Sequence, residues 1–417
     1  MFFDFTFSMT KARIFYFNPT CELAVANGSF SYMPPLLLQV MERDLAVLPF
    51  IFGSENDFVI TETKPSDKYI EQLNNLGFKV PRFCTLSELE AMPADSFEAI
   101  CPWGWSPAAH FKLKKLKEKC SREFKSNPSY NWQQIHQSLF ERSTSLNILT
   151  DILNKDPQPW FINKSLTGVK ATSLYEIEKL MKEHQALVLK APLSSSGRGI
   201  QIIRSKTLNN SNKAWISGVL KQQNYLIAEP YLEKLADLSF QFRITESAEI
   251  DYLGFTFFET NSNGQYKGTL INTSIADVFP DKNVNELEEM INKTAQIIRE
   301  ELKSSVYTSL HGGFLGVDAM IFRNEKHIMI QPCIEINCRM NMGILSILLQ
   351  NSIQSEVKGK FELYYGSMGD FEIFAKKEEI SNPPVILNGK ISSGFFPLVE
   401  PVQHQKFGAY FFVSGTR

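Results

Sequence analysis

The chain has 417 residues, of which 43% are hydrophobic and 33 are Phe, so it can bury more than one large core and we expect two or three domains. Its 43 basic and 45 acidic side chains give a net charge of −2, which argues against a protein that binds nucleic acid or an anionic membrane through its overall charge. The six cysteines form no C-x-x-C pair, and the aromatic start lacks the basic region of an export signal. We therefore expect a cytoplasmic protein without a zinc site, a disulfide framework or a membrane span.

The first 125 residues alternate between strand-like and helix-like patterns. Helical spacing appears at 34–46 and 66–77, and the short β-rich runs are 12–17, 57–62, 77–83 and 97–103. This alternation is typical of a parallel, doubly wound sheet, so we predict an α/β domain over 1–125. Ligands bind beyond the carboxyl ends of strands in such sheets, where this chain carries Asn18, Glu22, Trp103 and Trp105. Plain core packing of the two Trp side chains is the favoured alternative.

A basic segment at 110–120 has helical spacing, and we expect its charges to form a solvated face. The breaker-rich stretch 121–131 contains Asn-Pro, and we place a linker at 126–134. A helix over 135–153, which contains Arg142, is predicted to follow.

The stretch Leu187–Arg204, LVLKAPLSSSGRGIQIIR, holds two apolar runs around a loop of Ser and Gly. The loop at 191–199 is longer than the roughly two to five residues that a hairpin needs. Backbone N–H groups of a Gly-rich loop, three serine hydroxyls and the charge of Lys190 at its base would suit a phosphate. The sequence is neither a Walker A motif nor GxGxxG, so a flexible turn is the alternative.

Acidic side chains follow farther along the chain, within apolar runs. The pattern of 225–244 predicts a strand, a connector and a second strand, and it contains Glu229, Glu233 and Asp237. In 312–349, one strand-like run carries Asp318 and another carries Glu335 and Asn337, whose spacing of two puts them on one face. Converging oxygen ligands of this kind suit Mg²⁺ on nucleotide phosphates, and a solvated strand face is the alternative. Burial in apolar surroundings favours the cation, since a buried carboxylate needs a partner.

Taken in order, the lysine and Gly-rich loop, EPYL (229–232), GVDAM (316–320) and EIN (335–337) resemble the ATP-grasp superfamily, chiefly carboxylate–amine and carboxylate–thiol ligases. The resemblance covers roughly 135–350. It implies an α+β chain, with an ATP-grasp fold preceded by a Rossmann-like parallel-sheet α/β domain. The implied domains are 1–125, the linker 126–134, a subdomain with the lysine and loop at 135–225, and a subdomain with the metal site and a C-terminal extension at 226–417.

The resemblance also implies site residues. Lys190 and Arg142 match phosphate contacts, and Arg339 matches a cation that faces the transferred phosphate or a substrate carboxylate, so Lys190 and Arg339 are the implied catalytic residues. The loop that closes over the phosphates matches Ser195, Ser196, Gly197 and Gly199. The adenine-binding connector and the ribose-binding acid match Glu229, Tyr231, Leu232 and Asp237. The metal ligands match Asp318, Glu335 and Asn337.

One spacing departs from the family pattern. Glu335 follows Asp318 by 17 residues, and Pro332 interrupts the second strand. A turn at Asn324-Glu325 would set Asp318 opposite Gln331 and leave Glu335 roughly 13 Å farther along, at about 3.3 Å per residue. We therefore expect a bulge at Pro332 or a wider loop to restore the convergence.

Two further assignments are open. Arg243 and Lys267 are alternatives for a third basic contact, each more often a surface charge. His311, before two glycines, is a possible substrate contact, and the other histidines show no metal spacing.

The implied function is an ATP- and Mg²⁺-dependent (or Mn²⁺-dependent) ligase that forms ADP and activates a small-molecule or peptide carboxylate as an acylphosphate for attack by an amine or a thiol. A phosphotransferase on the same scaffold and a non-catalytic nucleotide-binding protein are the alternatives. A homodimer is possible, and no nucleic-acid or membrane partner is expected.

Overall fold

The structure is a computed structural model that describes residues 11–194, 199–261 and 264–414. Two compact units divide the chain: the first contains the described parts of 1–24, 28–132 and 348–417, and the second contains 25–27 and 133–347. Within the described ranges, no helix combines the length and apolar character that crossing a membrane requires. All six cysteines are free thiols.

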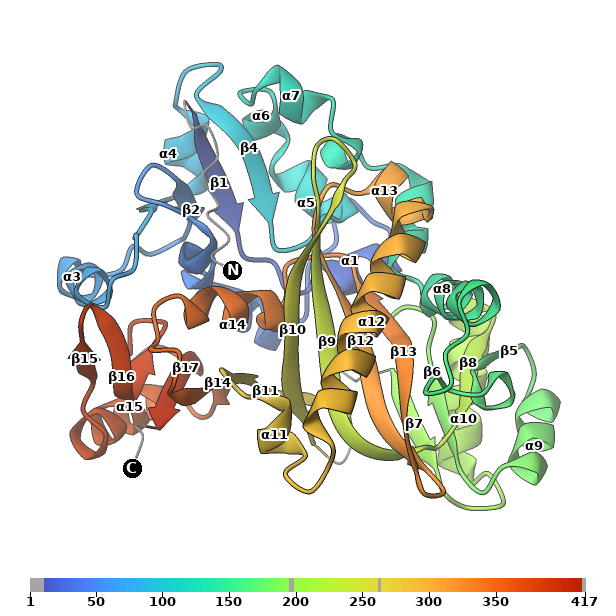
Figure 1. Ribbon diagram of the computed structural model, residues 1–417. Helices are drawn as coiled ribbons and strands as arrows, with labels where there is room; N and C mark the ends of the chain where they lie inside the picture. The colour runs from blue at the N-terminus through green and yellow to red at the C-terminus, as the bar shows by residue number, and fades with distance from the viewer. Residues whose placement is uncertain (1–10, 195–198, 262–263, 415–417) are drawn as a thin grey trace. The chain divides into compact units, whose positions relative to one another are not determined.

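The first unit is built on a four-stranded parallel sheet in the order β3-β2-β1-β4. Its strands are β1 (Ala12–Tyr16), β2 (Phe58–Ile60), β3 (Arg82–Cys84) and β4 (Phe97–Pro102). Its helices are α1 (Cys21–Asn27, at the boundary of the units), α2 (Leu36–Asp44), η1 (Leu48–Phe52), α3 (Asp67–Asn75), α4 (Leu86–Glu90), α5 (Pro107–Lys112), α6 (Lys114–Lys117), α7 (Arg122–Lys125) and η2 (Pro128–Tyr130). The central strand β1 lies between β2 and β4 (Figure 1), and its Ile14 is fully buried. The α/β domain predicted from the alternating pattern is confirmed.

The last part of the chain belongs to the first unit as well. It contains the antiparallel strands β14 (Lys358–Tyr365), β15 (Val385–Leu387), β16 (Lys390–Pro397) and β17 (Phe407–Ser414), together with α15 (Asp370–Ser381). The buried carboxylate of Asp44 on α2 accepts the backbone N–H groups of Lys406 (2.8 Å) and Phe407 (3.2 Å). The predicted domain 226–417 is therefore divided, because residues 348–417 belong to the first unit. There they pack with residues that come more than 300 positions earlier. The helix α14 (Met342–Gln350) crosses the boundary between the units.

The second unit holds two antiparallel sheets. The smaller has the order β5-β8-β6-β7, with β5 (Val169–Ala171), β6 (Leu187–Lys190), β7 (Ile200–Ile203) and β8 (Leu226–Pro230). Its helices are α9 (Leu174–Glu183) and α10 (Asn210–Gln223). Because β8 pairs with β5 and β6, this subdomain ends after Pro230, a few residues beyond the predicted boundary at 225.

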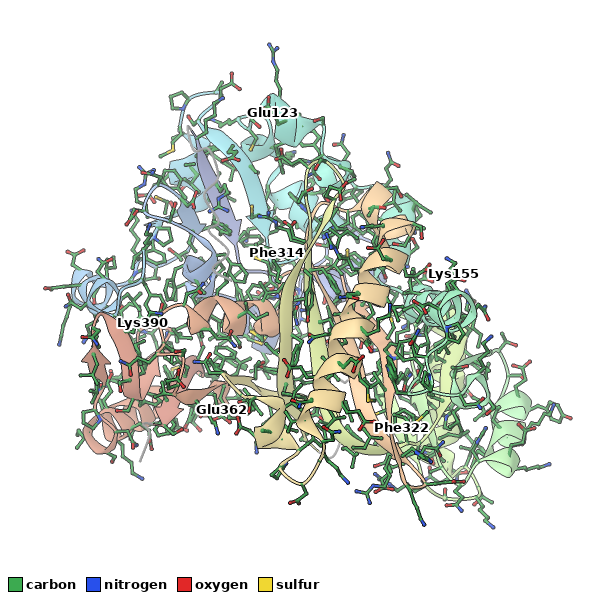
Figure 2. All side chains as sticks on the ribbon, in the orientation of Figure 1. Glu123, Lys155, Phe314, Phe322, Glu362 and Lys390 are labelled. Atoms are coloured by element: carbon green, nitrogen blue, oxygen red, sulfur yellow. The ribbon has the colours of Figure 1, made fainter. Side chains whose placement is uncertain are left out.

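The larger sheet of this unit runs β13-β12-β9-β10-β11. Its strands are β9 (Glu233–Ile244), β10 (Ile250–Thr260), β11 (Tyr266–Ile271), β12 (Gly313–Asn324) and β13 (His327–Asn337). Its helical segments are η3 (Gln134–Phe140), α8 (Arg142–Lys155), η4 (Lys164–Leu166), α11 (Ile275–Val278), α12 (Val284–Lys303) and α13 (Val306–Leu310). The long helix α12 lies along one face of the sheet beside α8 (Figure 1), and the Lys155–Glu301 ion pair joins the two helices at 2.8 Å. Figure 2 labels Lys155, and also Phe314 and Phe322 at opposite ends of β12.

Two helix predictions need correction. The helix expected over 135–153 is divided, because Glu141 adopts an extended conformation between η3 and α8. The N–H of Arg142 then donates to Pro192 O at 3.0 Å, a tertiary bond that starts α8 at Arg142. The basic segment 110–120 is likewise broken at Leu113, and Lys117 is buried instead of solvated.

Candidate active site

A β-bulge brings the two predicted metal-binding carboxylates together. At the hairpin, Asn324 pairs with His327, so the turn lies one residue later than predicted, and Met320 pairs with Gln331. The next pair is Asp318 with Glu335, which leaves the three residues from Pro332 to Ile334 opposite Ala319 alone. Extra residues on one strand are what a bulge contains, and a proline is tolerated there because it donates no ladder hydrogen bond. The bulge predicted at Pro332 is confirmed.

Asp318 sits in a chain of hydrogen bonds. Its Oδ1 accepts from the hydroxyl of Ser239 at 2.6 Å, and its Oδ2 accepts from the amide of Asn337 at 2.9 Å. Arg339 donates to the Asn337 Oδ1 at 2.9 Å and so fixes the amide with its nitrogen toward Asp318. Desolvation, with a further contribution from the charge of Glu335, raises the pKa of Asp318 from 3.8 to about 7. Two carboxylates this close favour a cation between them or a shared proton.

Sequence reasoning missed Ser239, which pairs directly with Asp318 across β9 and β12. The available signal was the alternation in 238–244, LSFQFRI. Ser239 and Gln241 are polar residues two apart within an aromatic strand, and both are buried. Gln241 donates to Ser239 Oγ at 2.8 Å and accepts from Asn341 at 2.9 Å. These bonds hold the Ser239 hydroxyl that donates to Asp318.

Arg142 links Glu335, one of the predicted metal-binding carboxylates, to the loop after β6. Its Nη2 lies 2.9 Å from Glu335 Oε1, and its Nη1 donates to Ala191 O at 2.6 Å and to Ser194 Oγ at 2.5 Å. The guanidinium is 3% exposed, and its Nε–H has no hydrogen-bond partner among the described residues. A buried, unpaired N–H on a cation is suited to an additional anionic acceptor such as a phosphate oxygen.

Lys190 and Glu229 form a second buried ion pair. Lys190 Nζ lies 2.6 Å from Glu229 Oε2, with side-chain exposures of 7% and 14%. The pair arises because β6 and β8 are neighbours, with Val188 opposite Glu229. Cys333 lies in the bulge, where its thiol bonds Ser145 O at 3.5 Å and burial raises its pKa. Arg142, which bonds both Glu335 and the carbonyl of Ala191 next to Lys190, is the link between the Lys190–Glu229 pair and the carboxylates.

The Gly-rich loop is described only at its ends. Ser195, Ser196 and Gly197 lie outside the described residues, whereas Gly199 accepts the N–H of Ala191 at 2.8 Å. A Cβ atom at Gly199 would come within 2.3 Å of the Ser194 side chain, the same side chain that Arg142 holds. Position 199 therefore requires glycine, because the Ser194 side chain occupies the space that a Cβ atom would need.

The predicted connector joins the two sheets of the second unit. Tyr231 donates its N–H to Ala186 O at 2.9 Å, and its half-exposed ring lies 5.0 Å from the Arg204 guanidinium carbon. Leu232 packs against the core of the larger sheet. Asp237 accepts from Lys234 at 2.5 Å and from Thr260 at 2.9 Å, and it lies two residues before Ser239 on β9.

The remaining sequence candidates have other surroundings. Arg243 pairs with Asp251 at 2.8 Å, and Lys267 is exposed on β11. Their assignment as a third basic contact stays a prediction. His311 is buried and its Nε2 bonds Phe314 O at 3.0 Å. Burial lowers its pKa to about 4, so this imidazole is a neutral structural group.

At the strand ends of the first unit, Trp103 and Trp105 are 1% and 9% exposed, which confirms the core-packing alternative. Asn18 donates to Gly104 O at 2.8 Å and so ties the segments after β1 and β4 together. Glu22 is buried.

The donor set fits a magnesium ion that a nucleotide brings with it. Among the described residues, no group of three or more His, Cys, Asp or Glu side chains could hold a metal ion unaided. Asp318 and Glu335 supply oxygen donors, whereas Asn337 turns its amide nitrogen toward Asp318 and its oxygen toward Arg339. Mg²⁺ is commonly held by one or two carboxylates together with phosphate oxygens. The raised pKa of Asp318 and the unpaired N–H of Arg142 fit such a Mg²⁺–phosphate group.

Comparison with models of protein families and with curated protein sequences gives no match. Solved structures do match, and each of the three described next covers 98% of this chain. Biotin carboxylase from Campylobacter jejuni has a TM-score of 0.52 and 13% identity, with 88% of that chain covered. The biotin carboxylase domain of Hydrogenobacter thermophilus 2-oxoglutarate carboxylase has a TM-score of 0.51 and 12% identity, with 87% covered. Rhizobium etli pyruvate carboxylase has a TM-score of 0.52 and 11% identity, with 36% covered. The fold is thus the ATP-grasp fold, as the sequence predicts.

Proposed function

We propose that this protein is an ATP- and Mg²⁺-dependent ligase that activates a carboxylate as an acylphosphate and joins it to an amine. One observation carries the proposal: the buried guanidinium of Arg142 bonds both Glu335, which pairs with Asp318 across two strands, and the carbonyl of Ala191, which follows the ion-paired Lys190. The similar Hydrogenobacter domain was solved with MgADP and bicarbonate, and the Campylobacter enzyme with a β,γ-ATP compound. A nucleotide bound on the same fold accounts for both buried cations.

Different side chains of the site bind the phosphates, position other side chains and hold the metal ion. Lys190 and Arg142 bind the phosphates, because both cations are buried beside the loop that Gly199 closes. Glu229 holds Lys190 in place, and Ser239 and Asn337 orient Asp318. Asp318 and Glu335 would hold Mg²⁺, which supplies charge neutralisation and alignment of the phosphates when bound. Asn337 would join them once its amide oxygen, here bonded to Arg339, turns to the ion.

The carboxylate substrate attacks the γ-phosphorus of ATP, the bond to the ADP oxygen breaks, and an acylphosphate and ADP result. The amine then attacks the acyl carbon, loses a proton and displaces phosphate. Arg339, whose guanidinium donates to Asn337 and to Met340 O at 3.1 Å, would stabilise the developing negative charge. No nucleophilic side chain is needed, in agreement with the raised pKa of Cys333 beside the site.

The first test is calorimetric titration with Mg²⁺ and a non-hydrolysable ATP analogue. Glu335→Gln removes a metal-binding charge, and we expect at least tenfold weaker binding. Glu300→Gln is the matched control, since Glu300 is an exposed residue of α12 that pairs with Lys303. Equal affinity of the parent protein, Glu335→Gln and Glu300→Gln for the Mg²⁺–nucleotide would contradict the proposed site.

Turnover then separates the alternatives. ADP and phosphate release that requires both a carboxylate and an amine supports the ligase. ADP release without an amine, with a phosphorylated product, indicates a phosphotransferase, and binding without turnover indicates a nucleotide-binding protein. Use of Mn²⁺ or of a thiol, a homodimer and a cytoplasmic location remain predictions.

A further inference from the structure

A cavity of about 920 Å³ opens in the first unit, at the carboxyl edge of the parallel sheet. Its lining comes from the segments that follow β1, β2, β3 and β4, with α2 and α5 as walls. Ligands bind at this edge of open α/β sheets, and the volume suits a small molecule. None of the nucleotide-site residues contributes to it.

Part of the wall is apolar and exposed. Phe30, Met33 and Phe111 line the cavity and are 52%, 71% and 55% exposed. Three large apolar side chains left in contact with solvent around one hollow indicate a ligand with an apolar body.

Of the charged side chains that line the cavity, Arg43 and Glu90 have ion-pair partners elsewhere and Glu62 is exposed, whereas Glu42 and Lys112 carry opposite charges without pairing with each other. Glu42 on α2 accepts from the Thr20 N–H (3.3 Å) and hydroxyl (2.5 Å), and both bonds go to its Oε1. Lys112 at the end of α5 donates to the phenol oxygen of Tyr16 at 2.9 Å. Desolvation raises the pKa of Glu42, opposed in part by Thr20 and by the charge of Lys112. The charge of each group thus affects the pKa of the other, yet no ion pair joins them among the described residues. Glu42 Oε2 remains able to accept a hydrogen bond from a ligand.

A third polar group points to a ligand independently. Thr61 follows β2, lines the cavity and is 3% exposed, and its hydroxyl has no hydrogen-bond partner in the described part of the chain. Its N–H is already bonded to Cys84 O at 2.9 Å. An unpaired buried hydroxyl is unfavourable, by about 1–3 kcal/mol, until a ligand atom pairs with it.

We propose that this cavity binds an α-amino acid with an apolar side chain. Its ammonium group pairs with Glu42 Oε2, its carboxylate pairs with Lys112 and the Thr61 hydroxyl, and its side chain packs on Phe30 and Met33. Opposite charges that line one cavity without an ion pair between them match a zwitterion, whereas a simple amine or acid would leave one of them unpaired. Binding requires no ATP; that the amino acid is a substrate of the ligation rests on the proposed function.

The test is calorimetry on the full chain without nucleotide. The ligands are L-phenylalanine, L-leucine, phenethylamine, 3-phenylpropionate and L-glutamate. We expect saturable binding of the first two, and at least tenfold weaker binding of the amine, the acid and glutamate.

Three variants locate the site. Glu42→Gln and Lys112→Met should each weaken phenylalanine binding at least tenfold, and the nearly isosteric Thr61→Val should weaken it severalfold. Lys68→Met is the matched control, since Lys68 is exposed on α3 and does not line the cavity. Thermal unfolding of each variant checks folding, and Thr61→Val tests the site without altering a charge.

The proposal is overturned if no apolar amino acid binds at millimolar concentration. It is overturned also if phenethylamine binds as tightly as phenylalanine, or if folded Glu42→Gln and Lys112→Met bind as the parent does. A protein that binds phenylalanine but shows no Mg²⁺–ATP binding would retain the cavity assignment and lose the ligase. The reverse result would retain the ligase and lose the cavity assignment.

Discussion

Replacing Lys190 by Met separates the role of the Lys190–Glu229 pair in folding from its role in binding. The ammonium and carboxylate lie 2.6 Å apart at 7% and 14% exposure. Met occupies the space of the lysine stem but carries no charge. We expect weaker binding of Mg²⁺ with a non-hydrolysable ATP analogue, because a buried cation that contacts phosphate is lost.

The magnitude follows from the chemistry of the pair. A hydrogen bond to a charged group contributes about 1.5–3 kcal/mol, and each 1.4 kcal/mol is tenfold in affinity, so binding should weaken roughly 10- to 150-fold. Removing one partner of a buried pair also destabilises a protein by about 3–5 kcal/mol, and the remaining exposure of Glu229 favours the lower end. The double variant Lys190→Met/Glu229→Gln removes both charges. Its free energy of unfolding should return most of the way from that of Lys190→Met to that of the parent, whereas its nucleotide affinity should stay as weak as that of Lys190→Met.

Calorimetric titration and urea unfolding measure the two quantities. Lys303→Met, an exposed lysine of α12, is the control and should match the parent in both. Binding by Lys190→Met within twofold of the parent, or affinity restored by the double variant, would refute the assignment of Lys190 to the phosphates.

Two other predictions concern the loop and the pH dependence of folding. Gly199→Ala should weaken nucleotide binding at least tenfold, since the new Cβ displaces Ser194, whereas Gly218→Ala on α10, with open space around it, should bind normally; equal titration curves would contradict this. His311 has a pKa of about 4 in the folded protein against 6.5 when unfolded, so its contribution of roughly 3 kcal/mol is present above pH 6.5 and is lost as the pH falls toward 4. Urea unfolding from pH 7 to 4 should show a shallower loss of stability in His311→Gln, whose amide can still donate to Phe314 O; parallel pH profiles would exclude this origin.

Local pattern was enough to predict much of the fold. The parallel sheet of the first unit follows from short β-rich runs alternating with helices, since periodicity depends on neighbouring residues alone. The same applies to the strands that carry Asp318 and Glu335. The proline within the second strand led us to expect either a bulge or a wider loop, because its missing N–H limits where it can stand, and the structure contains the bulge.

The sequence by itself determined which residues carry charge within apolar runs, and so which side chains needed partners. Only the tertiary structure decided those partners. Arg142 meets Glu335 across 193 positions, Ser239 meets Asp318 across 79, and Asp44 meets Lys406 across 362. Such pairings depend on which distant strands and helices exclude water together, and a buried charge accepts whichever donor that packing supplies. No local period of the sequence contains this information.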